Sequence, residues 1–99
     1  MRTFDYSKRF KRDYKLCQKQ GKDMNKLHNV LRILASGEPI PTQYKDHALK
    51  NNWAEHRDLH IEPDWILIYK IQGDEIILLA ATGTHSHVLL KGFQTIKIV

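Results

Sequence analysis

The first third of the chain changes from a strand-like to a helix-like spacing of apolar residues. Residues 2–6 alternate polar and apolar side chains, which predicts a short strand with Phe4 and Tyr6 facing inward. Over residues 7–20 the apolar positions follow a helical period, and Ser7 is placed to cap the helix. The apolar face of this helix consists of Phe10, Tyr14 and Cys17, while lysines and arginines occupy most other positions.

A second helix is predicted after a connection of about three residues. Asp23 can cap it, and apolar residues recur at three- and four-residue spacing until Gly37 and Pro39 stop it. The short connection predicts an antiparallel helical hairpin whose apolar stripes face the same surface. The stripe of the second helix consists of Met24, Leu27, Val30, Leu31, Ile33 and Leu34.

Three segments in the second half of the chain have the composition and turn residues of strands. They cover residues 55–62, 65–72 and 75–83, with turns at 63–64 and 73–74. Together they predict an antiparallel meander that can receive the apolar stripes of the helices. The sequence therefore predicts an α+β fold in one domain, with an N-terminal strand, the helical hairpin and then the meander packed on the helices.

The polar residues of the first meander strand are expected to share one face. Alternate side chains of a strand point the same way, so the polar set lies opposite Leu59 and Ile61 and looks away from the helices. There it would meet segment 38–53, which reads as an irregular loop carrying His47, and segment 82–85, to form a shallow concave site. The polar set consists of His56, Asp58, His60 and Glu62.

The chain has 99 residues and a formal net charge of +5, which limits its size and its partners. This length supports a single core and no separate cofactor-binding domain. The positive charge favours a polyanionic partner without separating RNA, DNA, a membrane surface and an acidic protein. A single cysteine excludes an intrachain disulfide, and neither a signal peptide nor a membrane-spanning run is evident. We expect a cytoplasmic protein.

Histidines, carboxylates and cations are concentrated in residues 44–65 and again around His85. Cleavage of RNA by its own 2′-hydroxyl needs a base, an acid and cations, and histidine can take either proton-transfer role near neutral pH. The reaction needs no Mg²⁺, and clustered acidic metal motifs are absent from the sequence, so we predict no metal and no cofactor. Two alternatives are a hydrogen-bonded network that stiffens the scaffold and a metal site that lacks a usual ligand set. The histidines of that metal site would be His56, His60, His85 and His87.

Several short strings of residues, taken in order, resemble those of a known toxin family. They are residues 22–27 (KDMNKL), 44–47 (YKDH), Trp53, Arg57 with Asp58, His60, residues 62–70 (EPDWILIYK) and 82–85 (TGTH). Their order and spacing resemble the YafQ toxins of the RelE superfamily, which belong to bacterial type II toxin-antitoxin systems. The resemblance implies a RelE-like fold of two helices on an antiparallel sheet, in agreement with the order of elements above.

The same resemblance implies a function and partners. It implies a ribosome-dependent mRNA endonuclease that inhibits translation and is held inactive by a cognate antitoxin. The partners would be that antitoxin, for which we expect a ribbon-helix-helix protein, together with the ribosome and mRNA, and no membrane. The alternative from another class is a RelE-like module that binds RNA or antitoxin without cleaving RNA.

The family's functional residues can be carried over position by position. The histidines fall on His47, His60 and His85, and an acidic-aromatic pair falls on Asp64 and Trp65. We expect His85 and Asp64 to transfer protons and His47 and His60 to orient the phosphate or assist, and which group is acid and which is base stays open. The RNA-binding residues would be Trp65 and the cations Lys45, Lys50, Arg57 and Lys91.

The chain departs from the family pattern at Ala81, where the family usually carries an arginine four residues before the last histidine. A guanidinium at this position would stabilise the charge of the phosphorane, so Ala81 is itself a candidate site position. Either another of the four cations replaces it or the chain is a weakened variant, and we favour the second explanation. A C-terminal aromatic is also missing, which Phe93 could replace, and the tail 94–99 has no family counterpart.

Overall fold

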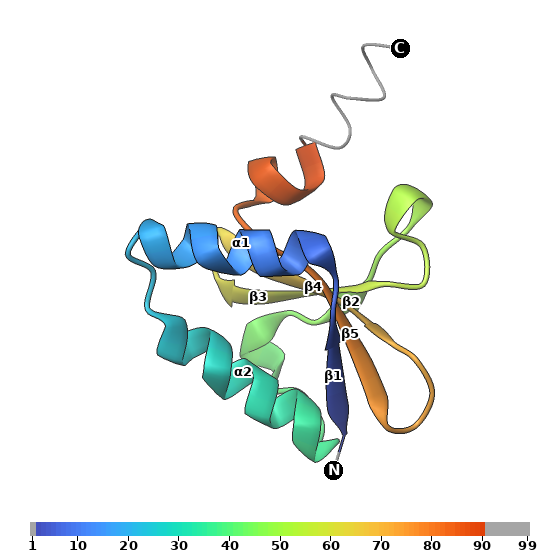
Figure 1. The fold of residues 1–99 in the computed structure, drawn as a ribbon. Coiled ribbons are helices and arrows are strands. Elements are labelled where there is room, and N and C mark those ends of the chain that lie inside the picture. The colour runs from blue at the N-terminus through green and yellow to red at the C-terminus, as the bar shows by residue number, and fades with distance from the viewer. Residues whose placement is uncertain (1, 91–99) are drawn as a thin grey trace.

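The computed structural model describes residues 2–90, which form a five-stranded sheet with two helices against it (Figure 1). The strand order is β1-β5-β4-β3-β2. β1 pairs in parallel with β5, whereas the other neighbouring strands are antiparallel. The predicted α+β class and order of elements are confirmed. The strands are β1 (Thr3–Tyr6), β2 (His47–Ala48), β3 (Arg57–Glu62), β4 (Trp65–Ile71) and β5 (Ile76–Gly83).

The two helices begin and end where the sequence predicts. α1 is Lys8–Lys19 and α2 is Met24–Ser36. The side chains of Ser7 and Asp23 accept hydrogen bonds from backbone amides in the first turn of each helix, and Gly37 ends α2 with a left-handed φ of 76°. Figure 1 shows that α2 returns at an angle to α1, so that α1 lies against β5 and α2 against β3.

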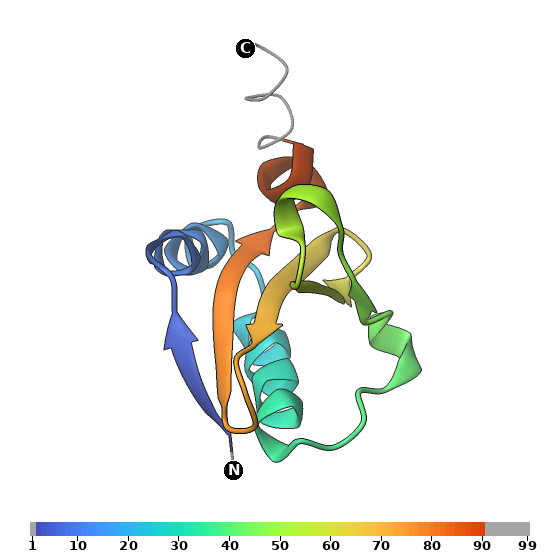
Figure 2. The ribbon, with the colours of Figure 1, turned by 90° about the vertical axis from the view of Figure 1, so that its right-hand side faces the viewer.

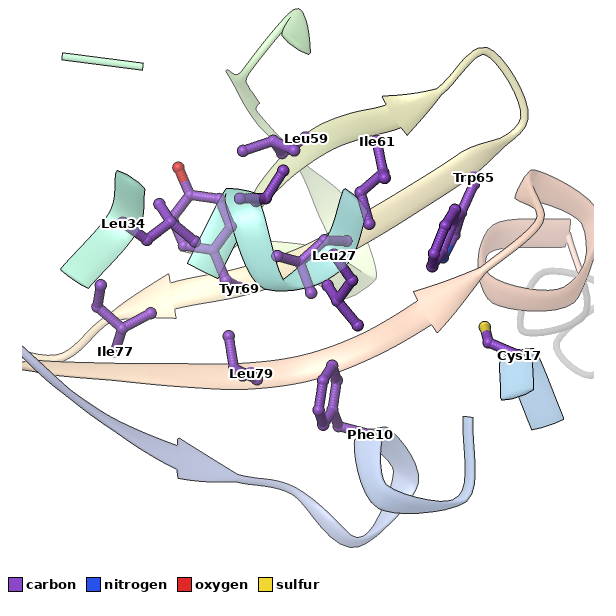
Figure 3. Close-up of a cluster of buried hydrophobic side chains, with 12 residues drawn as sticks. Phe10, Cys17, Leu27, Leu34, Leu59, Ile61, Trp65, Tyr69, Ile77 and Leu79 are labelled. Carbon is purple, nitrogen blue, oxygen red and sulfur yellow. The ribbon is translucent and has the colours of Figure 1, made fainter. Parts of the chain in front are cut away.

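The main hydrophobic core fills the space between the helices and the sheet (Figure 3). Phe4 packs against this core as predicted, but the inward placement of Tyr6 is wrong, since Tyr6 is 50% exposed. β1 is the edge strand, and the ring of Tyr6 meets that of Phe10 at a centroid distance of 5.9 Å instead of entering the core. The buried core residues are Phe10, Cys17, Leu27, Val30, Leu34, Leu59, Ile61, Trp65, Leu67, Tyr69, Ile77 and Leu79.

A second, smaller cluster lies on the other face of the sheet. A bulge between β4 and β5 shifts the register, so Ile68 pairs with Ala81 while Tyr69 pairs with Leu79. Ala81 therefore points away from the helix-covered core. Figures 1 and 2 show the β2–β3 connection arching over the side of the sheet opposite α2. The cluster consists of Ile66, Ile68, Ala80, Ala81 and Val88, with Leu49, Trp53 and Leu89 packed against it.

The segment between α2 and β3 is more regular than the predicted loop. It contains two short 3₁₀ helices, η1 (Thr42–Tyr44) and η2 (Asn51–Trp53), with β2 between them. His47 lies on β2 and is held by pairing with β3, so its expected place in an irregular loop is wrong. A strand of two residues is too short to show a period of two in the sequence, which explains the difference.

The last described element is a π-helix, η3 (Ser86–Leu90), after β5. The predictions for Lys91, Phe93 and the tail 94–99 lie outside the described residues. Within residues 2–90, none of the helices combines the length and the apolar character that crossing a membrane requires.

Candidate active site

Three imidazole rings form a row on the face of the sheet opposite the main core. His47 comes from β2, His60 from β3, and His85 from the segment just after β5. The ring centroids of His47 and His60 are 6.0 Å apart, and those of His60 and His85 are 5.2 Å apart. The three histidines that the family resemblance selected are therefore brought together, with His60 in the middle.

Asp64 holds the ring of His85 in one orientation. Its Oδ1 accepts a hydrogen bond from the backbone amide of His85 at 3.0 Å and lies 2.7 Å from the His85 Nδ1. These two contacts, the backbone one first, lower the pKa of Asp64, so the carboxylate is ionised and accepts the Nδ1 proton. The His85 Nε2 is then directed toward the His60 Nε2 at 3.2 Å. Asp64 is therefore placed to orient the His85 ring.

Asp58 is a site residue to which the sequence reasoning gave no role. It is 2% exposed, its Oδ2 lies 3.6 Å from the His47 Nε2, and its Oδ1 has no hydrogen-bond partner among the described residues. Burial raises the pKa of Asp58, and the nearby histidines His60, His47 and His85 oppose that rise. The signal was present in the strand parity, which put Asp58 beside His60, but burial of this face was not foreseen.

The raised pKa predicts that Asp58→Asn stabilises the fold in a pH-dependent way. When a carboxyl has a higher pKa in the folded than in the unfolded state, its ionisation destabilises the fold. This loss of stability begins near the unfolded pKa of about 4 and grows as the pH rises. We expect a gain of about 1 kcal/mol at about pH 8, which is about 4–8 °C in Tm for a domain of this size. At about pH 3 both states are protonated and the gain should vanish. Thermal unfolding at both pH values measures the gain in stability, and Asp5→Asn at an exposed position is the control. An equal gain at both pH values would exclude ionisation of Asp58 as the cause.

A hollow of about 300 Å³ opens beside the histidine row. His60 and Lys45 both line it, and the backbone carbonyl of Lys45 lies 2.8 Å from the His47 Nδ1, which must therefore donate its proton to that oxygen. Lys45 therefore lies beside two of the three histidines. The other lining residues are Gln43, Tyr44, Ile61, Glu62 and Pro63.

Arg57 and Trp65 are not placed as the RNA contacts that the sequence suggested. Arg57 alternates with Asp58 on β3 and so points to the helix side, where it pairs with Asp46 at 3.0 Å. Hydrogen bonding to Asp46 raises the pKa of Arg57, and Tyr69 also donates to Asp46. Trp65 is fully buried and donates its indole proton to Thr82 at 3.0 Å, so it cannot stack on an RNA base. Lys50 is exposed, and Lys91 lies outside the described residues.

Ala81 lies in line with two of the site residues. Across the sheet, Ala81 pairs with Ile68, Ile68 pairs with Asp58, and Asp58 pairs with His47. Side chains in such a row share one face, so an arginine at position 81 would extend over Ile68 toward Asp58. In this chain the position is fully buried and apolar, which leaves the unpartnered Asp58 Oδ1 without a cation from this side.

A set of potential metal ligands differs from the one weighed in the sequence. His47, Asp58 and His60 each offer a ligand atom, and these atoms all lie within 4.8 Å of one another. The set of His56, His60, His85 and His87 is not assembled: the ring of His56 packs edge-on against Trp53, and His87 contacts Asp13.

The comparisons with known proteins agree with this fold. Residues 2–90 match the family model described as "Bacterial toxin of type II toxin-antitoxin system, YafQ". The chain belongs to the YafQ toxin family. A relative, the mRNA interferase toxin YafQ of Escherichia coli strain B, is 48% identical over 86 residues, which cover 86% of this chain and 92% of the relative.

Two solved structures extend the comparison for this YafQ-family chain. The E. coli DinJ–YafQ complex contains a chain that is 46% identical, with a TM-score of 0.82, over 90% of this chain and 99% of that one. A metal-bound toxin from Helicobacter pylori is 37% identical, with a TM-score of 0.83, over 90% of this chain and 100% of that one. These similarities confirm the YafQ-like fold.

Proposed function

We propose that this YafQ-family toxin is an mRNA endonuclease that cleaves RNA through the RNA's own 2′-hydroxyl. The observation that carries the proposal is the row of three imidazoles, with a carboxylate beside each end: Asp58 near His47 at 3.6 Å and Asp64 near His85 at 2.7 Å. A scissile phosphate over His60 would have a proton-transfer group on either side. The mRNA interferase activity named for the E. coli relative supports this function.

The chemistry assigns a task to each group. The 2′-oxygen attacks phosphorus as a base removes its proton, and the bond to the 5′-oxygen breaks as an acid protonates that oxygen. We propose His47 and His85 for these two roles, in an order that stays open, because they flank His60 and each can carry a proton at Nε2. Asp64 orients His85, Asp58 tunes His47, and His60 and Lys45 face the phosphate.

The missing arginine supports the hypothesis of a weakened enzyme. Of the four cations that could replace it, Arg57 is on the other face and paired, and Lys91 lies outside the described residues. Lys45 and Lys50 remain, and a lysine presents a single charge instead of the fork of a guanidinium. The missing arginine also fits the alternative, a RelE-like module that binds RNA or antitoxin without cleaving RNA.

The partners follow from the charge of the chain and from one relative. The net charge of +5 suits the ribosome and mRNA, and α1 carries six cations and a single carboxylate, Asp13, which is buried. The E. coli relative was crystallised with the antitoxin DinJ. We propose that this chain likewise binds a cognate antitoxin, whose acidic segments would cover basic surface.

The metal-bound H. pylori relative raises a second use of the same cluster. An ion held by His47, Asp58 and His60 would occupy the His47 nitrogen that we propose for proton transfer. The two uses therefore exclude one another at any one moment.

A single 2′-deoxynucleotide tests the proposed reaction. The cut position in a translated mRNA is mapped first, and an otherwise identical mRNA then carries 2′-deoxyribose on the 5′ side of that bond. We expect cleavage at that bond to stop, because the nucleophile is gone, while a deoxy substitution three residues away has no effect. Cutting at an unchanged rate would show that water, not the 2′-oxygen, attacks.

A further inference from the structure

A buried carboxylate on α1 lies outside the histidine row and has no role in the proposed reaction. Asp13 is 5% exposed and lies on the helix face that packs on β5. The sequence predicted only apolar residues for that face. Buried carboxylates are retained only with hydrogen-bond partners, so the partners of Asp13 indicate what it holds in place.

The two oxygens of Asp13 bind the chain on both sides of His85. Oδ2 accepts a hydrogen bond from the backbone amide of Thr82 at 3.1 Å, and Oδ1 lies 2.9 Å from the Nε2 of His87. Thr82 precedes His85 by three residues and His87 follows it by two. The Asp13 carboxylate thus holds both ends of the loop that carries His85.

Arg9 ties the same loop to α1 at a second point. Its guanidinium donates to the carbonyls of His87 at 3.1 Å and Val88 at 3.3 Å, and its Nε lies 3.5 Å from Asp13. The loop is also tight, because a Cβ built on Gly83 would come within 3.1 Å of the His87 ring. The position of His87 is therefore fixed by contacts on three sides.

We propose that Asp13 is a positioning residue that holds the loop of residues 82–87 so that His85 stays directed at His60. The proposal rests on the proposed function only for its consequence on cleavage, since the orientation of His85 is a property of the folded chain. Asp64 contacts His85 from an exposed turn, and it can orient the ring only if the loop brings His85 within reach. Without Asp13, Thr82 and His87 lose their common anchor.

The test compares four variants by a readout that does not depend on cleavage. Asp13→Ala removes the anchor, and His87→Ala removes its contact on the C-terminal side of His85. His87→Gln keeps a side-chain N–H donor, and Val30→Ala loosens the core on α2 away from the loop. The ¹⁵N chemical shifts of the His85 ring report the share of molecules in which Nδ1 carries the proton. The hydrogen bond to Asp64 requires this form of the ring. All spectra are recorded at temperatures where each variant is folded.

We expect Asp13→Ala and His87→Ala to lose the Nδ1-protonated preference, and His87→Gln and Val30→Ala to keep it. With translated mRNA, the first two should lower kcat about tenfold to 100-fold with KM within about twofold, as for a misplaced catalytic group. A His85 ring in Asp13→Ala that matches the one in Val30→Ala overturns the proposal. If the wild-type chain cuts no RNA, the proposed function fails while the ring shifts still decide the role of Asp13.

Discussion

Replacing His85 by alanine should lower mRNA cleavage about 10²- to 10⁴-fold, which is the usual contribution of a positioned acid or base. His85 has the most defined geometry of the three histidines, because Asp64 holds its Nδ1 at 2.7 Å and leaves Nε2 facing His60 at 3.2 Å. No other described imidazole contacts Asp64. Single-turnover cleavage of mRNA on ribosomes, measured with the variant and the wild-type chain, gives the ratio of rates.

A matched control keeps the result specific to the site. His28→Ala removes an exposed histidine on α2 that lies away from the histidine row and bonds Tyr14 at 2.8 Å. This variant should leave the cleavage rate unchanged within about twofold. Ribosome binding should be the same in both variants. Cleavage that survives in His85→Ala would remove His85 from the chemistry, and a wild-type chain that binds ribosomes without cutting would favour the non-catalytic module.

Replacing Ala81 by arginine should raise the cleavage rate about 100-fold. The loss of one charged or polar transition-state contact costs roughly 3 kcal/mol in other enzymes, so restoring one should recover a similar amount. The row from Ala81 over Ile68 to Asp58 directs the new side chain toward the unpartnered Asp58 Oδ1 and the histidines. The measurement is the same single-turnover assay, together with growth arrest on induction.

The buried environment of Ala81 requires a control for packing. The position is fully buried among Ile66, Ile68 and Val88, so any larger side chain should cost about 1–3 kcal/mol of stability. Ala81→Met adds comparable length without charge, and it should share that cost and gain no activity. An arginine variant no faster than the methionine variant would contradict the weakened-enzyme hypothesis.

Much of the fold could be predicted because local signals and tertiary packing agree. The caps at Ser7 and Asp23 and the stop at Gly37 are set by neighbouring residues, and the long β4 and β5 strands show their pattern within one segment. β2 could not be predicted, because two residues are too few to show a period and the strand is defined only by its pairing with β3. Tyr6 alternates with Phe4 as an inward-facing residue would, but it lies on the edge strand beyond the limit of the core.

The site shows a different limit. The three histidines and Asp64 were placed by family resemblance, whereas Asp58 and Asp13 acquire their roles from burial and from contacts between distant segments. A sequence gives no sign that a carboxylate will be buried, since most are exposed. The neighbouring residues Asp64 and Trp65 illustrate the point, because one lies in an exposed turn beside His85 and the other is fully buried in the main core.

The chemical nature of the cut ends distinguishes attack by the 2′-oxygen from attack by water. Cleavage of a translated mRNA by the wild-type chain, followed by mass spectrometry of the fragments, identifies both new termini. Attack by the 2′-oxygen, with proton transfer by the histidine row, predicts a 2′,3′-cyclic phosphate, or the 3′-phosphate formed from it, and a 5′-hydroxyl. A 3′-hydroxyl with a 5′-phosphate would rule out the proposed reaction, because these ends require attack by water instead of the 2′-hydroxyl.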